Sequence, residues 1–240
     1  MESTAIFIRS YRKDFEWLAY CLRSIQKYCT GFSEIIIAVP QGDAHLLAHL
    51  TEETVIPVYD GQPGYLCQQS DKLHADFHTR ADYILHVDSD SVFTTPTAPN
   101  DFLDPVRGIP IWRYVPIGSA SKQEIQAWLH VMVKALQQWP ENEWMRQAAV
   151  LIPRWAYKAF RDHMEKLHEM PLVAYIMNQP GNQFTEYNCM GMFLWNHFRS
   201  EIAWRNDKIE PTYDVNRIRQ FWSWGGLTPE IRHQIEELLQ

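Results

Sequence analysis

The chain has 240 residues, of which 46 % are hydrophobic and 21 % are charged. A chain of this length buries roughly 70 % of its unfolded surface, so this composition excludes a disordered or fibrous protein. No run approaches 18 consecutive apolar residues, which excludes an apolar membrane-spanning helix. The formal net charge of −7 gives no overall attraction to nucleic acid or anionic lipid, although it does not exclude local basic patches.

The cysteines and the start of the chain indicate a reducing compartment. No C-x-x-C pair occurs among the four cysteines, Cys21, Cys29, Cys67 and Cys189. We therefore expect free thiols and no zinc site. The first residues lead almost directly into an apolar run without a secretory signal, so we expect a cytoplasmic protein. Most of the ten tryptophans are expected in the core, and their number also suits a cleft for planar or sugar-like ligands.

The first half alternates between strand and helix patterns. Phe15, Leu18, Leu22 and Ile25 recur at helical spacing, and Asp14 stands where a helix N-cap is expected. Pro57 marks its strand as an edge strand. Apolar strands separated by helices predict an α/β fold with a mostly parallel sheet covered by helices on both faces. The predicted strands are 5–8, 35–39, 55–59 and 83–87, and the predicted helices are 15–29, 43–50 and 68–80.

The second half is less regular. It shows no internal repeat and no glycine- or serine-rich linker. One domain over residues 1–240 is the simplest interpretation, with a nucleotide-binding half over about 1–100 and an acceptor half over about 101–240. The predicted strands here are 109–115 and 149–152, and the predicted helices are 122–138, 155–168, 186–197 and 229–239.

The segment with the clearest chemistry is the apolar strand 83–87 followed by Asp88-Ser89-Asp90. Ligands of open parallel sheets bind outside the carboxyl ends of strands, and residues i and i+2 of an extended chain point to one side. Asp88 and Asp90 can therefore present oxygens to one hard cation, Mg²⁺ or Mn²⁺, with phosphate oxygens completing its shell. The alternative is a plain loop in which Asp88 caps a turn and Asp90 is solvated.

Two enzyme classes place an Asp-x-Asp pair after an apolar strand. In a phosphatase of the haloacid dehalogenase type, Asp88 would be the nucleophile and Asp90 a general acid. That family usually carries the pair on its first strand and needs a downstream acidic pair, whereas here three strand–helix units come first. The GT-A glycosyltransferases carry the pair after such units, as this chain does.

The chain resembles the GT-A glycosyltransferases, and more narrowly a group of phage and bacterial proteins of unknown function within that superfamily. The resemblance rests on the exit of the first strand, the Asp-x-Asp pair and three further motifs. These motifs are Gln69-x-x-Lys72-Leu73, Phe184-Thr185-Glu186-Tyr187-Asn188-x-x-Gly191 and Phe221-Trp222-Ser223-Trp224-Gly225-Gly226.

The resemblance implies roles for the donor site. Asp88 and Asp90 would hold Mn²⁺ or Mg²⁺ on the diphosphate of a nucleotide sugar. Lys72 would reach the donor's phosphate or base, the alternative being a solvated lysine on its helix. The other implied donor-binding residues are Arg9, Ser10, Tyr11 and Ser89, together with Trp224 and Gly225 of a C-terminal flap. The alternative for Tyr11 is that it only covers the start of a helix. The alternative for the flap is a tryptophan-rich turn in the core.

The resemblance also implies an acceptor side. Glu186 would remove the proton of an acceptor hydroxyl or hold that hydroxyl, and the alternative is a glutamate favoured by the helix dipole. Gly191 indicates close packing against the layer of the aspartates or against a substrate. His197 and His233 are candidates for a third metal ligand, but each more simply belongs to the surface or the core.

The sequence thus predicts a metal-dependent glycosyltransferase that uses a nucleotide diphosphate sugar, expected to be a UDP-sugar. The acceptor stays open between a glycan, a protein, a small molecule and a hydroxymethylated base of phage DNA, and a phage-encoded enzyme would work in the host cytoplasm. Alternatives are the phosphatase and a non-catalytic nucleotide-sugar-binding module. Whether the basic residues of the second half form one face is open from the sequence; they are Arg107, Arg113, Lys122, Arg146, Arg154, Lys158 and Arg161.

Overall fold

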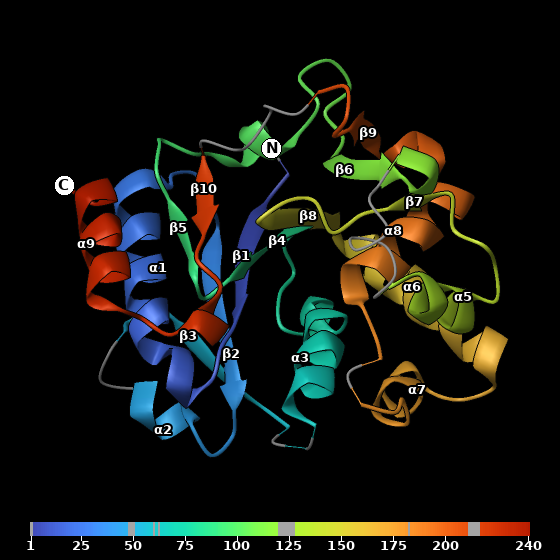
Figure 1. Ribbon diagram of the computed structural model, residues 1–240, viewed down its shortest axis with the longest axis horizontal. Coiled ribbons are helices and arrows are strands. Elements are labelled where there is room, and N and C mark those ends of the chain that lie inside the picture. The colour runs from blue at the N-terminus through green and yellow to red at the C-terminus, as the bar shows by residue number, and fades with distance from the viewer. Residues whose placement is uncertain are drawn as a thin grey trace.

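The computed structural model describes residues 2–47, 51–59, 61, 63–119, 128–181, 183–210 and 217–240. Its centre is a five-stranded sheet in the order β3-β2-β1-β4-β8 (Figure 1). Four strands are parallel, and β8 runs antiparallel to β4. The strands are β1 (Thr4–Arg9), β2 (Glu34–Pro40), β3 (Thr54–Val58), β4 (Tyr83–Asp88) and β8 (Ala149–Pro153). The predicted α/β class with a mostly parallel sheet is confirmed.

Alternating side chains of β1 pack into different clusters on the two faces of this sheet. Ile6 and Ile8 pack with helix α1 (Phe15–Tyr28). Ala5 and Phe7 pack with helix α3 (Gly64–Lys72) and with helices from the second half of the chain. In register, Phe7 lies beside Ile36 of β2 and His86 of β4. Burial on both faces explains why these strands read as nearly continuous apolar runs.

The second half adds a smaller sheet and a group of helices. Strands β6 (Ile111–Pro116), β7 (Asn142–Glu143) and β9 (Ala203–Asn206) pair in the order β7-β6-β9. Figure 1 shows its longer helices gathered to the right of the central sheet. The helices are α5 (Leu129–Leu136), α6 (Arg154–His168), α7 (Leu172–Met177) and α8 (Glu186–His197). In this half of the chain, four tryptophan rings pack against one another: Trp112, Trp144, Trp195 and Trp204.

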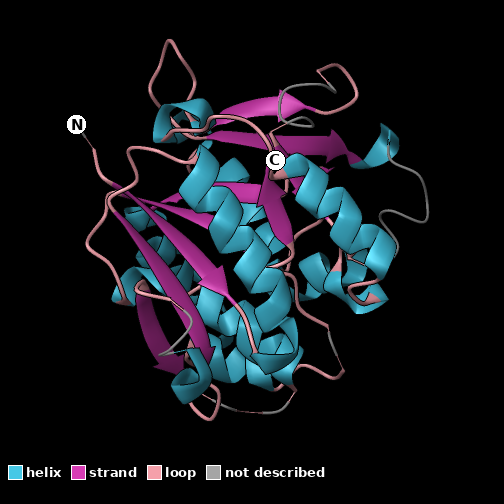
Figure 2. Cartoon of the chain, turned by 90° about the vertical axis from the view of Figure 1, so that its left-hand side faces the viewer, coloured by secondary structure: helices cyan, strands magenta, loops and turns pink. Residues whose placement is uncertain are grey.

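The C-terminal segment returns to the first half. Strand β10 (Ile218–Gln220) pairs antiparallel with β5 (Ser91–Phe93), which follows β4. Helix α9 (Pro229–Leu238) lies beside α1, to which Arg23 and Glu236 connect it. Figure 2 views the molecule from this side and shows helices in front of the strands. None of the described helices is both long and apolar enough to cross a membrane.

Several boundaries differ from the sequence predictions. The helix predicted over 68–80 is wrong: α3 covers 64–72, and a 3-10 turn over 75–77 follows. Arg161 donates to the carbonyl oxygen of Leu73 at 3.0 Å, and this oxygen is an acceptor that a continued helix would need.

Helix α7 and the short strands β5, β7, β9 and β10 were not predicted. Parts of two predicted helices, 48–50 and 122–127, lie outside the described residues. The edge position of β3 is confirmed.

Candidate functional site

A cavity of about 590 Å³ opens at the carboxyl ends of the parallel strands. Its walls come from the segments that follow β1, β2 and β3 and from the beginning of α3. The lining residues are 9–14, Pro40, Gly42, Asp43, Tyr59, Gly61, Gly64, Tyr65, Cys67 and Gln68. This edge is where parallel α/β sheets bind ligands, because loops and helix N-termini converge there.

Three residues predicted to bind the donor, Arg9, Ser10 and Tyr11, lie together in this wall. Arg9 is buried, and its Nε donates to Asp71 at 2.6 Å. The hydroxyl oxygen of Ser10 is buried and has no hydrogen-bond partner among the described residues, an arrangement that native proteins rarely leave unsatisfied. Tyr11 is 42 % exposed and offers an aromatic face. The wall therefore combines a fixed cation, an unpaired hydroxyl and an aromatic ring.

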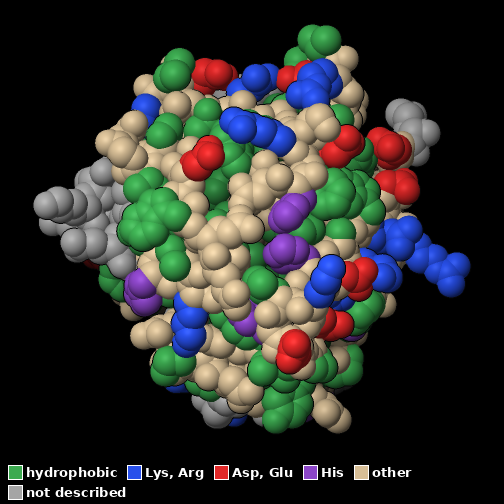
Figure 3. Space-filling model, turned by 90° about the vertical axis from the view of Figure 1, so that its right-hand side faces the viewer, with side chains coloured by type: hydrophobic (Ala, Val, Ile, Leu, Met, Phe, Trp, Pro, Cys, Tyr) green, Lys and Arg blue, Asp and Glu red, His purple; other side chains and the backbone are tan. Residues whose placement is uncertain are grey.

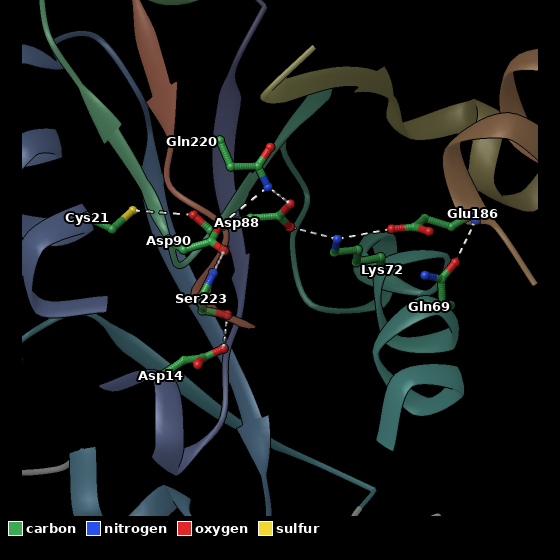
Figure 4. A network of polar contacts seen from close by, with 9 residues as sticks. All are labelled: Asp14, Cys21, Gln69, Lys72, Asp88, Asp90, Glu186, Gln220 and Ser223. Carbon is green, nitrogen blue, oxygen red and sulfur yellow. Dashed lines mark hydrogen bonds and ion pairs between the residues drawn. The ribbon is translucent and has the colours of Figure 1, made fainter. Parts of the chain in front are cut away.

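Asp88 and Asp90 converge at the end of β4, as predicted. One donor, the amide nitrogen Nε2 of Gln220, lies 3.1 Å from Asp88 Oδ2 and 3.5 Å from Asp90 Oδ1 (Figure 4). The Asp88 side chain is 29 % exposed. Asp90 is 8 % exposed, which contradicts the alternative of a solvated Asp90. Ser89, between them, is buried, and none of these three residues is among those that line the cavity.

The environment of Asp90 favours neutralisation of its charge. Burial raises the pKa of Asp90, and the nearby charge of Asp88 raises it further. The backbone N–H of Ser223, 2.7 Å from Asp90 Oδ2, and the Gln220 amide act in the opposite direction. Two carboxylates that approach each other this closely repel unless a cation or hydrogen-bond donors lie between them.

Lys72 links the aspartates to the predicted catalytic residue. Its Nζ lies 2.8 Å from Asp88 Oδ1 and 3.0 Å from Glu186 Oε1 (Figure 4). Burial alone would lower the pKa of Lys72, but these carboxylates outweigh it and hold the pKa well above its usual value. The side chain is 5 % exposed, so the alternative of a solvated lysine is wrong. Lys72 is a permanent buried cation beside the aspartates.

Glu186 begins α8 and faces α3 instead of solvent. Its backbone N–H donates to Gln69 Oε1 at 2.7 Å, so the two sequence motifs meet here. The residue is 2 % exposed, and within the described part of the chain its buried Oε2 has no hydrogen-bond partner. A substrate hydroxyl can reach this oxygen only when neighbouring side chains move. Gly191, further along α8, packs against Trp144 and not against the aspartates.

The C-terminal segment supplies residues that the sequence analysis missed. The pairing of β10 with β5 places Gln220 opposite Ser91, directly after the aspartates. Ser223 donates from its backbone to Asp90 and from its hydroxyl to Asp14 Oδ2, at 3.3 Å. The sequence offered one signal, the neighbouring tryptophan-rich motif. Asp14 precedes α1 as predicted but makes no capping hydrogen bond with its side chain.

Trp224 and Gly225 are not brought into the cavity wall with Arg9, Ser10 and Tyr11. Trp224 is 88 % exposed, and no atom lies within 4 Å of the position that a Cβ would take at Gly225. A tryptophan-rich core turn, the alternative for this motif, is contradicted by that exposure. Their predicted role in donor binding stays a prediction.

The residues fit a hard divalent cation in part. Carboxylate oxygens are the ligands that Mg²⁺ and Mn²⁺ prefer, and the position of the Gln220 amide shows that both aspartates point at one place. Within the described ranges, however, no three His, Cys, Asp or Glu side chains are close enough to hold a metal ion. The site would need further ligands from the substrate.

Neither candidate histidine supplies that ligand. His197 ends α8, about 16 Å along the helix from Glu186, and packs against His163 and Phe193. His233 pairs with Glu237 on α9 at 3.3 Å. Both therefore match the simpler expectation of surface or core histidines.

Comparison with known proteins adds no relative: no protein-family model matches the chain, and no curated protein matches it either. The resemblance to GT-A glycosyltransferases therefore stays a prediction. The geometry of the site and its place in an α/β fold carry the functional argument.

Proposed function

We propose that this protein is a metal-dependent glycosyltransferase that moves a sugar from a nucleotide diphosphate sugar to a hydroxyl acceptor. The observation that carries the proposal is the convergence of Asp88 and Asp90 on one amide nitrogen, at the edge of the sheet where the cavity opens. A nucleoside fits a cavity of this size with aromatic and cationic walls. The diphosphate would then extend toward the aspartates.

The proposal gives each donor-side residue a task. Tyr11 offers an aromatic face for the base, and the free hydroxyl of Ser10 can donate to the nucleoside. Asp88 and Asp90 would hold Mn²⁺ or Mg²⁺ in place of the Gln220 amide, and the cation supplies Lewis-acid stabilisation of the diphosphate leaving group. Lys72 Nζ lies 2.8 Å from Asp88 and so places a positive charge beside the proposed cation site. This charge would stabilise the negative charge that develops on the diphosphate leaving group.

The transfer needs a proton acceptor. The oxygen of the acceptor hydroxyl bonds to the anomeric carbon, the bond from that carbon to the diphosphate breaks, and the hydroxyl proton leaves. Glu186 Oε2 is a buried carboxylate oxygen without a hydrogen-bond partner among the described residues, so it is our candidate for receiving the proton or holding the hydroxyl. Its ion pair with Lys72 keeps Glu186 in place.

A thermal-shift panel of nucleotide sugars, with and without Mn²⁺ and beginning with UDP-sugars, tests the donor assignment. At a hundredfold excess over its dissociation constant the correct donor stabilises by about 2.7 kcal/mol, a rise in Tm of several degrees. We expect Asp90→Asn to abolish the Mn²⁺-dependent rise. The matched control Asp162→Asn changes an exposed aspartate that pairs with Lys158 and should keep it. Unchanged binding by Asp90→Asn would remove the basis of the proposal.

Glu186→Gln separates an enzyme from a binding module. We expect transfer or donor hydrolysis to fall while donor affinity persists, and equal loss of both would contradict the assigned role. The phosphatase alternative predicts hydrolysis of simple phosphate monoesters and a phosphoaspartate at Asp88. Mass spectrometry after incubation with p-nitrophenyl phosphate detects that adduct.

A further inference from the structure

Two large aromatic side chains are exposed beside the aspartates. Trp222 is 58 % exposed and Trp224 is 88 % exposed. Single exposed apolar side chains are common on proteins and need no explanation. These two, however, flank Ser223, whose backbone N–H lies 2.7 Å from Asp90. The backbone that carries the pair is therefore held next to the proposed site.

The backbone at Trp222 is held in an unfavourable conformation. Its φ of 56° lies in the left-handed region that a bulky side chain seldom adopts. Of the other described residues that are not glycine, Gln137 and Glu169 also have positive φ, but each ends a helix, where this conformation is common. Trp222 ends no helix. The residues on either side of Trp222 are both held by Asp90. The backbone N–H of Phe221 donates to the Asp90 carbonyl oxygen at 3.0 Å, and that of Ser223 donates to the Asp90 side chain. These two hydrogen bonds maintain the positive φ at Trp222.

The charges around the two tryptophans disfavour an anionic partner. Asp88 and Asp90 lie beside Ser223, and so does Asp14. Two arginines of this segment have protein partners, but only Arg232 pairs with an acid, so Arg219 keeps its positive charge. Arg219 lies over the ring of Phe221 at 4.8 Å and donates to Gln234, and Arg232 pairs with Glu16. A phosphate-rich or carboxylate-rich acceptor would meet repulsion from these carboxylates wherever a bound cation does not neutralise them.

Lys122 lies outside the described residues, and the described basic residues of the second half do not form one basic face. Figure 3 shows basic and acidic side chains interspersed on the right-hand face of the molecule. Four of the described basic residues named in the sequence analysis are paired with acids, in the pairs Arg113–Asp207, Arg146–Glu143, Lys158–Asp162 and Arg161–Asp76. Together with the net charge of −7, this arrangement weakens the expectation of a DNA acceptor.

We propose that Trp222 and Trp224 form an acceptor platform on which an uncharged sugar ring stacks, so that the acceptor is a neutral glycan. The inference rests on the proposed function. An indole offers a large apolar face and a polar N–H edge, which match the C–H face and the hydroxyl rim of a pyranose. Ser223 joins the platform to Asp90, so a short oligosaccharide on the indoles extends toward the proposed cation site.

Calorimetric titration with defined probes tests this assignment. The probes are the uncharged hexasaccharides of maltose, cellulose, chitin and mannan type, and a hydroxymethylcytosine-containing oligonucleotide as the anionic acceptor. Each is added to the full chain in the presence of Mn²⁺ and the nucleotide of the identified donor. The variants are Trp222→Ala, Trp224→Ala and Trp224→Phe. The matched control is Trp139→Ala, which removes a tryptophan that is 71 % exposed elsewhere.

We expect at least one hexasaccharide to bind the wild type. Trp222→Ala and Trp224→Ala should each weaken that binding by about tenfold or more, Trp224→Phe by less, and Trp139→Ala should leave it unchanged. The acceptor platform replaces the donor-binding role that the resemblance implies for Trp224. Affinity for nucleotide and Mn²⁺ should therefore be the same in all four variants, which also shows that they fold.

Other results overturn the inference while the proposed function stands: no hexasaccharide binds, the oligonucleotide binds more tightly, or Trp139→Ala weakens glycan binding as much as Trp224→Ala does. An equal loss of nucleotide affinity in Trp224→Ala would place the platform on the donor and also overturn it. Absence of any Mn²⁺-dependent nucleotide-sugar binding by the wild type would refute both.

Discussion

Asp14 precedes α1, and its carboxylate accepts a hydrogen bond from the Ser223 hydroxyl. Burial raises the pKa of Asp14 from 3.8 to about 6; the Ser223 hydrogen bond opposes the shift, and the charges of Asp90 and Asp88 add to it. The folded protein therefore binds a proton here between pH 4 and 6 that the unfolded chain releases. The contribution of this group to stability is complete below about pH 4 and is lost as the pH rises through about 6.

Asp14→Asn should consequently stabilise the metal-free protein at pH 7.5 by about 1 kcal/mol, a figure kept small because water screens this half-buried group. At pH 4 the variant and the wild type should be equally stable, because the wild-type carboxyl is then neutral. Urea unfolding at the two pH values measures the difference. Asp162→Asn, at an exposed position, should show no such pH dependence. A constant difference at both pH values would contradict the shifted pKa.

Lys72 shows why a buried cation matters for the neighbouring acids. Its ammonium is the counter-charge for Asp88 and Glu186, and the Tyr187 ring lies 4.9 Å from it. Removing one partner of such a buried pair leaves an uncompensated charge, which typically costs about 3–5 kcal/mol. Loss of activity on changing Lys72 would thus mix folding with chemistry, so the functional tests above use Asp90 and Glu186.

Helix α8 depends on a glycine in its middle. A Cβ at Gly191 would lie 2.6 Å from the indole ring of Trp144, and that ring is buried. Gly191→Ala gains up to about 1 kcal/mol in helix propensity but forces the packed indole to shift. We expect a net loss of about 1–3 kcal/mol in urea unfolding. Gly64→Ala at the start of α3, where the added methyl meets no atom within 4 Å, should cost little. Equal effects of the two changes would contradict the packing argument.

Long elements were predictable because their signals are local. The apolar face of α1 and the continuous apolar run of β4 each lie within one stretch of sequence. The short strands β5, β7, β9 and β10 have two to four residues. Such segments become strands only through their partners, so no pattern within them predicts pairing. The end of α3 was likewise set by Arg161, which lies 88 residues from Leu73.

At the scale of the whole molecule, the sequence predicted the parallel half of the sheet but not the antiparallel direction of β8. An apolar strand of this kind fits either direction, and the long connection before it leaves both open. The site, too, has a part that the sequence predicted and a part that it did not. Asp88 and Asp90 share one turn, whereas Gln220 reaches them across 130 or more residues. Its approach depends on the β10–β5 pairing, which the sequence did not reveal.

Helix α9 connects this distant segment to the first half. Ile235 is fully buried and packs in one cluster with Trp17 of α1 and Val92 of β5. Ile235→Ala should weaken this docking by about 2–4 kcal/mol, because it leaves a cavity at a fully buried position of the cluster that joins α9 to α1 and β5. We expect hydrogen exchange, followed by mass spectrometry, to accelerate over residues 217–240 while β1 and β4 stay protected. The Mn²⁺-dependent rise in Tm with the donor should shrink, since Ser223 loses its fixed position beside Asp90. Ile209→Ala, at a residue 74 % exposed, is the matched control and should change neither result. Uniformly faster exchange across the central sheet would instead show that α9 stabilises the whole fold and does not hold the C-terminal segment alone.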